Sequence, residues 1–533
     1  MNHKYRVLIA DKITPEGLAP LEDDDRFELE RRIGLDQEAL ADALVDFDAV
    51  LVRSTTKISA EALAKTERLK VIGRAGVGVD TIDVAAATKK GIPVLNAPAG
   101  NTTSAAELTF ALLMALARRI PAADRSMKAG EWNRSQLAGT ELSGKTLGLV
   151  GAGRVGGEVA RRARAFDMRV LVYDPYLTDE QAERLGITRV ELDEALSQAD
   201  FVSIHVPLTD STRGLIGPRE LSLMKPGAML VNAARGEVVD EAALVDALIQ
   251  NHLGGAALDV YATEPLPQDH PLRQLDNIIL TPHLGASTGE AQRSVALEIA
   301  EGVRDALLEG DLSRAVNAPS IGGAEMQRLR PLLDLTTKLG RVARTLAGGP
   351  IQRVELRYAG DRENVLRPLS AAAMIGLLAD VVGRQAVNFV NALHLANERG
   401  LKLERTRTDR MEAYGEYIEI TVSGSDTEFK VAGAMLGEEH PRIVRLGDYY
   451  VDVVPSGCLV ILRNQDVPGV VGKVGTLLGE AGVNIAEYHQ ARHERGGEAL
   501  AAIRVDQPLD ESLIDQLAAA PEIVEVSQVD LRE

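Results

Sequence analysis

Leu147-Gly148-Leu149-Val150-Gly151-Ala152-Gly153-Arg154-Val155-Gly156 carries the strongest structural signal in this sequence. Its apolar start suits a buried strand, and its end is a G-x-G-x-x-G pattern that opens a helix running to about Phe166. Gly151 allows the tight turn, Gly153 lets the backbone approach a pyrophosphate, and Gly156 permits close packing of helix on strand. Free N–H groups at the helix N-terminus then bind the anion. The alternative is a tight strand–helix turn that binds no ligand.

An acidic residue follows where a dinucleotide-binding unit needs one. Asp174 ends the next apolar run, 23 positions after Gly151. An acid there hydrogen-bonds the hydroxyls of the adenine ribose, and its charge repels the 2′-phosphate of NADP. Pro175 and Tyr176 follow, with no adjacent arginine. The pattern predicts NAD as the cofactor. The simpler interpretation is that Asp174 caps a turn before Pro175.

Short apolar runs alternate with helical stretches on both sides of this turn. Such a βαβ rhythm predicts parallel sheets with helices on both faces. Residues 1–95 form one series, and a second begins at Thr146. A helix over about 104–119, opened by a capping box of Ser104 and Glu107, lies between them. We expect a helix over 289–308 to pack back on the N-terminal lobe.

The rhythm changes after a glycine-rich linker at 310–323. Residues 366–398 are alanine-rich and predict helix, and strand patterns follow up to Val454. The last 76 residues have the order strand, helix, strand, strand, helix, strand. That order predicts a ferredoxin-like βαββαβ domain.

Composition excludes several classes of protein. The chain has 533 residues, with 59 Lys and Arg against 78 Asp and Glu, so its net charge is −19. An acidic surface of this size disfavours nucleic acid as a partner. Cys458 is the single cysteine, so an intrachain disulfide and a cysteine-based metal cluster are excluded, and we expect no metal site. The longest apolar stretch is too short to span a membrane, and a cytoplasmic protein is expected.

Three polar side chains follow strands of the second series. Arg235, Glu264 and His283 each come shortly after an apolar run. Ligands of open α/β sheets bind beyond the carboxyl ends of the strands, so these side chains are expected to converge. An arginine can hold a carboxylate through two hydrogen bonds, and a histidine beside a carboxylate can transfer a proton near neutral pH. Taken singly, His283 has the simpler interpretation of a hydrogen-bonded structural residue, and Glu264 that of a solvated turn.

Together these motifs resemble the D-2-hydroxyacid dehydrogenase family over residues 1 to about 316. Asn96-Ala97-Pro98-Ala99-Gly100-Asn101, Ala234-Arg235-Gly236, Leu258-Asp259-Val260, Glu264-Pro265 and Pro282-His283 occur in the family's order. The resemblance implies that Arg235 binds the carboxylate and carbonyl of the substrate, that His283 is the acid/base, and that Glu264 pairs with it. The implied cofactor contacts are Gly151, Gly153, Arg154, Val155, Gly156, Asp174, Val206, Pro207, Ala233, Ala234 and Asp259.

Residues 52–57, 73–80 and 282–288 are more similar to the long-type subfamily, which acts on D-3-phosphoglycerate. This similarity implies a homo-oligomer, either a dimer or a tetramer. Arg134 would then reach the substrate phosphate from a neighbouring subunit. The residues that would line the substrate site are Arg53, Ser54, Arg74 and Asn101.

The C-terminal residues resemble an ACT domain, and residues 318–454 resemble the intervening domain of the same subfamily. ACT domains bind an amino acid at two turns between paired domains. The resemblance implies that Asn464, Asp466 and Asn484 bind an effector, with L-serine expected; the alternative is ordinary turn chemistry. In the intervening domain Arg442 and Arg445 could bind an anion, although an exposed basic pair is the simpler interpretation.

The expected architecture is a Rossmann-type NAD-binding domain inserted in a flavodoxin-like substrate lobe, followed by an α+β intervening domain and a ferredoxin-like ACT domain. The expected function is NAD-dependent oxidation of D-3-phosphoglycerate to 3-phosphohydroxypyruvate, the first step of L-serine biosynthesis, with feedback by serine. One rival is another D-2-hydroxyacid dehydrogenase with side activity on 2-oxoglutarate. A second is a catalytically silent sensor of NAD and amino acids, against which Arg235, Glu264 and His283 argue. The expected boundaries are 1–95 with 285–316, 96–284, 318–454 and 456–533.

Overall fold

The N-terminal series folds into a parallel sheet with the strand order β2-β1-β3-β4-β5. This is the flavodoxin-like order 2-1-3-4-5, as the sequence predicts. The central strands are apolar throughout because packed helices cover both faces. The elements are β1 (Tyr5–Ile9), α1 (Ala19–Glu22), β2 (Phe27–Arg31), α2 (Gln37–Leu44), β3 (Ala49–Val52), α3 (Ala60–Ala64), β4 (Val71–Arg74), α4 (Val84–Lys89) and β5 (Val94–Asn96).

The long helix α12 (Gly289–Glu309) returns the chain to this lobe, as expected. Its buried residues Val295, Ile299 and Val303 share a core with β1 and β3. The approach to β4 is close, because a Cβ on Gly73 would lie 2.8 Å from Val303. The substrate lobe is therefore built from two separate stretches of the chain.

The second series forms a seven-stranded parallel sheet in the order β12-β11-β10-β9-β6-β7-β8. Numbered from β6, its first six strands have the Rossmann order 3-2-1-4-5-6. The strands are β6 (Thr146–Val150), β7 (Arg169–Tyr173), β8 (Thr188–Arg189), β9 (Phe201–Ile204), β10 (Met229–Asn232), β11 (Gly255–Leu258) and β12 (Ile278–Leu280). The helices are α5 (Thr102–Ala117), α6 (Ile120–Lys128), α7 (Arg154–Ala165), α8 (Asp179–Leu185), α9 (Leu192–Gln198), α10 (Pro218–Leu223) and α11 (Glu241–Ile249).

The predicted capping box at the start of α5 is wrong. The helix begins at Thr102, so Ser104 and Glu107 lie inside it, and no side chain caps its N-terminus. Glu107 instead forms an ion pair of 3.2 Å with Arg162 of α7. The carboxylate of Glu107 therefore contacts the neighbouring helix α7 and does not cap α5.

The intervening domain packs two long helices on one face of a mixed sheet of order β14-β13-β15-β16-β17-β18. The single helix predicted over 366–398 is two helices in the structure. The first ends at Val382, before Gly383, whose φ of 95° favours glycine, and Asn388 and Asn391 hold the connecting turn. The elements are α13 (Gly323–Leu346), β13 (Arg353–Ala359), α14 (Leu366–Val382), α15 (Ala392–Glu398), β14 (Lys402–Thr408), β15 (Glu416–Ser423), β16 (Glu428–Leu436), β17 (His440–Leu446) and β18 (Tyr449–Val453).

The C-terminal domain has the βαββαβ order that the sequence predicts, with an antiparallel sheet β20-β21-β19-β22. One face packs on its own two helices. The other face contributes Leu459, Ile461 and Val529 to the core of the intervening domain, so the two domains share one apolar interior. The elements are β19 (Cys458–Gln465), α16 (Val470–Glu480), β20 (Ile485–Arg492), β21 (Glu498–Val505), α17 (Glu511–Ala518) and β22 (Ile523–Asp530).

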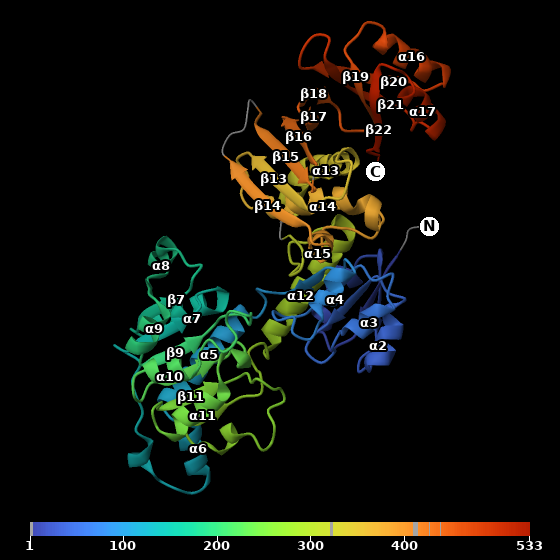
Figure 1. Ribbon diagram of the computed structural model, residues 1–533. Coiled ribbons are helices and arrows are strands. Elements are labelled where there is room, and N and C mark those ends of the chain that lie inside the picture. Colours follow the sequence, from blue (N-terminus) through green and yellow to red (C-terminus); the bar gives the residue numbers. More distant parts are fainter. Residues whose placement is uncertain (1–3, 320–322, 409–413, 426, 438, 533) are drawn as a thin grey trace.

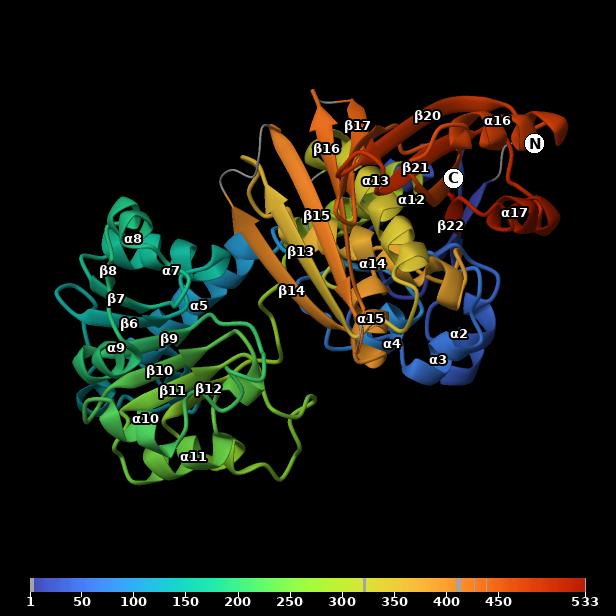
Figure 2. The same cartoon turned by 45° about the horizontal axis from the view of Figure 1, so that its top comes forward.

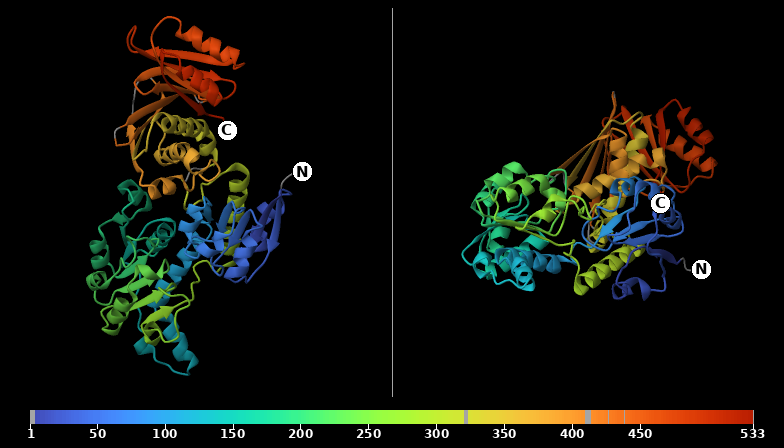
Figure 3. Two further views of the ribbon diagram at one scale, coloured as in Figure 1. Left: turned by 45° about the vertical axis from the view of Figure 1, so that its right-hand side comes forward. Right: turned by 90° about the horizontal axis from the view of Figure 1, so that it is seen from below.

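The structure, a computed structural model, describes residues 4–319, 323–408, 414–425, 427–437 and 439–532. The Rossmann-type lobe lies at one end and the C-terminal domain at the other, with the substrate lobe and the intervening domain between them (Figures 1 and 2). Two further views show the same succession of domains (Figure 3). Among the described residues, no helix has both the length and the apolar character needed to cross a bilayer.

Candidate active site

A cavity of about 430 Å³ lies between the first two lobes. Val77, Gly78 and Asp80 line it from the substrate lobe, and Asn101 lines it where α5 begins. The facing wall comes from the carboxyl edge of the seven-stranded sheet. Seven predicted site residues lie on that wall, namely Arg154, Val155, Val206, Pro207, Ala233, Ala234 and Arg235.

The glycine turn has the geometry that its pattern requires. Gly151 has a φ of 94°, a region that side chains disfavour. A Cβ on Gly156 would lie 2.1 Å from the carbonyl oxygen of Gly151, so a side chain cannot be accommodated there without a shift of backbone. A Cβ on Gly153 would meet nothing within 4 Å. Beside Gly153, α7 begins and leaves free N–H groups, so the turn fits a pyrophosphate.

Asp174 lies directly beside this turn. Its Oδ2 accepts a hydrogen bond of 2.9 Å from the backbone N–H of Ala152, and its Oδ1 accepts one of 2.9 Å from that of Tyr176. The second contact is the turn cap that the simpler interpretation expects. The first contact places the carboxylate next to the nucleotide-binding turn, where it can also meet a ribose.

His283 and Glu264 form a hydrogen-bonded pair at the carboxyl edge of the sheet. Nδ1 of His283 lies 2.7 Å from Oε2 of Glu264, and the backbone N–H of Tyr261 donates to Oε1 at 3.1 Å. Burial raises the pKa of Glu264, but the hydrogen bond and charge of His283, with help from Arg235, outweigh it and hold the pKa below its usual range. Glu264 is therefore a carboxylate at neutral pH. The histidine side chain is 50 % exposed, so Nε2 remains available.

Asp259 fixes the loop that carries His283. Its carboxylate accepts hydrogen bonds from Oγ1 of Thr281 at 2.6 Å and from the N–H groups of Leu284 and Gly285 at 2.7 and 2.9 Å. Burial raises the pKa of Asp259, and these donors oppose the shift. The loop holds His283 at a φ of 55°, which non-glycine residues rarely adopt. Asp259, 1 % exposed, thus lies beneath the histidine.

Arg74 of the first lobe is buried close to the charges of Arg53 and of Arg235, which lines the cavity from the other lobe. Burial lowers the pKa of Arg74 to about 10; the charges of Arg235 and Arg53 add to this effect, and Asp80 and Asp11 oppose it. Nε of Arg74 is buried without a hydrogen-bond partner in the described structure. The buried Oδ1 of Asn101 likewise has no partner there. These groups can accommodate an anionic ligand with its own hydrogen-bonding atoms.

Sequence reasoning missed three residues around this site, Asp11, Asp80 and His205. Asp11 holds the loop of Arg53 and Ser54 by accepting hydrogen bonds from the backbone N–H of Arg53 at 2.6 Å and from Thr56. His205 follows β9 and bonds Oγ of Ser203 at 2.8 Å. Burial lowers the pKa of His205 to about 4, so it is neutral near pH 7. The position of His205 directly after a strand of the sheet was the available signal.

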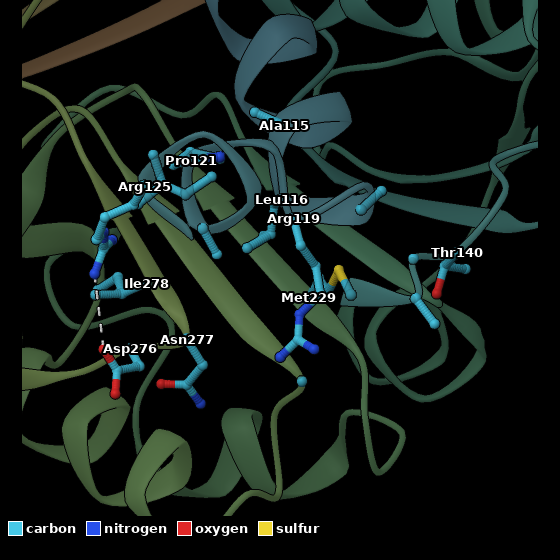
Figure 4. Close-up of a pocket in the computed structure, with 16 residues that line it drawn as sticks. Ala115, Leu116, Arg119, Pro121, Arg125, Thr140, Met229, Asp276, Asn277 and Ile278 are labelled. Atoms are coloured by element: carbon cyan, nitrogen blue, oxygen red, sulfur yellow. Dashed lines mark ion pairs between the residues drawn. The ribbon is translucent and has the colours of Figure 1, made fainter. Parts of the chain in front are cut away.

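A second cavity, of about 200 Å³, lies at the opposite edge of the same sheet (Figure 4). Met229 and Ile278, which line it, are the first residues of β10 and β12, so it faces the amino ends of the strands. Arg125 on its rim lies 3.9 Å from Asp276. None of the predicted site residues lines this cavity, and it is separate from the interlobe site.

The structure places one of the predicted effector residues differently from the prediction. Asn464 lies within β19 and is fully buried, with its Oδ1 unpartnered in the described structure, so its predicted place on the turn is wrong. Alternation along the strand puts its side chain on the helix-covered face, with Leu462. Asp466 follows the strand and accepts hydrogen bonds from Arg492 at 2.6 Å and the N–H of Gly496. Asn484 is exposed and donates to Asp506 at 2.8 Å.

The two arginines of the intervening domain have carboxylate partners. Arg442 pairs with Asp452 at 3.1 Å, and Arg445 pairs with Glu419 at 3.5 Å. These pairs disfavour an anion site, and both arginines are only partly exposed, so the exposed basic pair is wrong as well. Arg134 is exposed, outside the interlobe cavity.

Comparison with known proteins defines the class. Residues 110–285 match the NAD-binding domain of D-isomer-specific 2-hydroxyacid dehydrogenases, residues 328–447 the intervening domain of D-3-phosphoglycerate dehydrogenase, and residues 459–522 the ACT domain. D-lactate dehydrogenase of Aquifex aeolicus, solved with NAD and lactic acid, is 31% identical with a TM-score of 0.52, covering 59% of this chain and all of that one. The TT0316 protein of Thermus thermophilus is 39% identical with a TM-score of 0.53, covering 58% of this chain and 99% of that one. The fold and the NAD-binding domain are those of an oxidoreductase that uses NAD.

Curated relatives extend the match to the whole chain. D-3-phosphoglycerate dehydrogenase of Bacillus subtilis is 40% identical over 99% of this chain and 100% of its own length. The enzyme of the same name from Mycobacterium tuberculosis is 42% identical over 98% of this chain and 99% of its own. The chain belongs to the D-3-phosphoglycerate dehydrogenase family.

Proposed function

We propose that this enzyme oxidises D-3-phosphoglycerate at C2 to 3-phosphohydroxypyruvate, the first step of L-serine biosynthesis. The single observation that carries the proposal is the meeting of three arginines with the His283–Glu264 pair. The charges of Arg53 and Arg235 both reach the buried Arg74, and the charge of Arg235 also reaches Glu264 of the pair. Phosphoglycerate has an anion at each end, a carboxylate and a phosphate. Guanidinium groups bind both anions through paired hydrogen bonds.

In the proposed reaction, NAD supplies the acceptor for the hydride that leaves C2. Because Nδ1 of His283 bonds Glu264, Nε2 faces the substrate and takes the proton of the C2 hydroxyl. The electron pair of the broken O–H bond becomes the second bond of the C2 carbonyl. Glu264 stabilises the imidazolium that results, and Arg235 holds the carboxylate and the developing carbonyl.

The substrate lobe would bind the phosphate. Arg53 and Ser54 lie on the loop fixed by Asp11, and Arg74 lies at the end of the neighbouring strand β4. Asn101 lines the cavity from the start of α5. NADH formation with a panel of 2-hydroxy acids tests this assignment against the rival of another D-2-hydroxyacid dehydrogenase. A protein that binds NAD but oxidises none of them would favour the silent sensor.

We further propose that L-serine binds the ACT domain and inhibits turnover. The buried Oδ1 of Asn464 without a partner, with Asp466 close along the chain, supports a site for a small amino acid. The ACT sheet shares its core with the intervening domain, so inhibition would act by shifting populations of conformers rather than by blocking the active site. Serine titration by calorimetry beside rate assays tests this.

A homo-oligomer completes the proposal. Helix α6 has no buried residue, and Ile120, Met127 and Trp132 are exposed by 55, 55 and 80%. Exposed apolar side chains clustered along one segment favour a second copy as their partner. Arg134 follows Trp132 and could enter the neighbouring site. Light scattering gives the subunit number.

A phosphorylated acid does not cross bilayers unaided, so we place the reaction in the cytoplasm, which fractionation tests.

A further inference from the structure

Asp80 reaches the catalytic cleft from the substrate lobe. It lies between β4 and α4, and its Oδ2 is 3.2 Å from Nε of Arg235, a residue of the other lobe and 155 positions away in the sequence. The Asp80 side chain is 60% exposed and that of Arg235 is 26% exposed. The pair therefore crosses the cleft at its open side.

Two contacts fix the plane of the Arg235 guanidinium. Nε donates to Asp80, and Nη1 donates to the carbonyl oxygen of Ala234 at 2.7 Å. Nη2 rests against Gly78, where a Cβ would lie 2.0 Å from it. Nη2 has no hydrogen-bond partner in the part of the chain that the structure describes, so it is free for a ligand. An unrestrained arginine would lose rotamer entropy on binding, whereas these contacts hold Arg235 in place before the ligand arrives.

The charge of Asp80 also lets the arginines lie together. Arg74 is close enough to Arg235 for their charges to repel, and Asp80 opposes that repulsion at Arg74. Without this carboxylate, Arg235 would be free to turn away from Arg74 and out of the cleft.

We propose that Asp80 is a positioning residue, which orients Arg235 across the cleft for the carboxylate of the substrate. The inference rests on the proposed role of Arg235. The alternative is an exposed ion pair without a functional role, since such pairs contribute little to stability.

The test compares Asp80→Ala and Asp80→Asn with the matched control Asp83→Asn. Asp83 lies on the same loop and caps α4 by accepting from the N–H of Ala86, without touching Arg235. Asp80→Ala should lower kcat/KM by about 10- to 100-fold, because a misplaced binding group costs up to about that factor. Asp80→Asn keeps an acceptor for Nε and should restore part of the loss. The control should keep the wild-type kcat/KM, and the Kd for NADH should be unchanged in all three.

A double variant separates positioning from a general structural effect. In an Arg235→Ala background, Asp80→Ala should cause no further loss, because its effect passes through Arg235. An additive loss, or a wild-type kcat/KM in Asp80→Ala, would overturn the inference.

Assaying the same variants with the panel of 2-hydroxy acids distinguishes a failure of this inference from a failure of the proposed function. The carboxylate is common to all 2-hydroxy acids, so the loss should be the same for phosphoglycerate and for any other acid that is turned over. If the wild type does not use phosphoglycerate, the proposed function fails, and the ratio of variant to wild type on the other acids still measures Asp80. A loss confined to phosphorylated substrate would overturn the positioning role.

Discussion

Oε2 of Glu264 and Nδ1 of His283 are 2.7 Å apart, across a loop of the chain that separates the two residues by 19 positions. The contact fixes the orientation of the imidazole and leaves Nε2 available for the proposed proton transfer. The loop is itself held by the buried Asp259, which accounts for the unusual backbone of His283. The proposed acid/base is thus supported by two carboxylates with different tasks. Glu264 touches the ring, and Asp259 touches only the loop.

Replacing His283 should abolish most turnover while NAD still binds. General acid–base catalysis typically contributes about 10²–10⁴-fold. His283→Asn is the preferred variant, because asparagine tolerates the left-handed backbone better than alanine does. Steady-state rates and NADH fluorescence titration measure the two effects. Near-wild-type turnover at neutral pH would remove His283 from the mechanism.

Two neighbouring glycines of α7 should respond differently to alanine. A Cβ on Gly156 would lie 2.1 Å from a backbone oxygen, whereas on Gly157 its closest contact would be 3.8 Å. Gly156→Ala should therefore cost about 1–3 kcal/mol in stability and weaken NAD binding. Gly157→Ala should be neutral or stabilise by about 0.5–1 kcal/mol. Urea unfolding and NAD titration compare them, and equal effects would contradict the assigned turn geometry.

Asp174 should set the preference for NAD over NADP. Asp174→Ala removes the charge that repels a 2′-phosphate and also the hydrogen bond from Ala152. NAD should bind more weakly, and the ratio of kcat/KM values between the cofactors should fall by about tenfold or more, equivalent to about 1.4 kcal/mol. Asp179→Asn, which breaks the nearby surface pair with Arg189, is the control. Equal use of both cofactors by the wild type would refute this role.

Asp466→Ala should relieve inhibition by serine and leave uninhibited turnover nearly intact. The full chain is needed, because removing the ACT domain would expose core residues of the intervening domain. Glu522→Ala, which breaks the surface pair with Lys473 in the same domain, is the matched control. Rates are measured against serine concentration. Undetectable serine binding at millimolar concentration would end the proposal, and glycine is then the next effector to try.

The fold was largely predictable because its signals are local and repeated. The glycine turn, the alternation of strands with helices and the βαββαβ order each constrain neighbouring residues, and the structure has all three. The errors had two causes. Glu107 pairs with Arg162 of another helix instead of capping α5, and the local pattern does not contain that partner. The helix predicted over 366–398 is interrupted at Gly383, where the alanine-rich composition outweighed the glycine and the asparagines that follow it.

The candidate site was likewise predicted only in part. Arg235, Glu264 and His283 were identifiable because each follows a strand of a parallel sheet. Asp80 and Asp11 were not identified, since their partners Arg235 and Arg53 lie far away in the sequence. Asn464 was misplaced onto a turn, because the end of β19 extends to Gln465. The strand boundary could not be fixed by residue preference alone.

The most direct test of the proposed function is kcat/KM for NADH formation with D-3-phosphoglycerate and D-glycerate, in the wild type and in Arg53→Ala. Charge-assisted hydrogen bonds contribute about 1.5–3 kcal/mol, so the wild type should favour the phosphorylated acid by about 10- to 100-fold or more. Arg53→Ala should lose that advantage and leave D-glycerate little changed. Equal losses for both acids would show that Arg53 is not the phosphate ligand. A wild type that prefers D-glycerate or another unphosphorylated 2-hydroxy acid would contradict the proposed reaction.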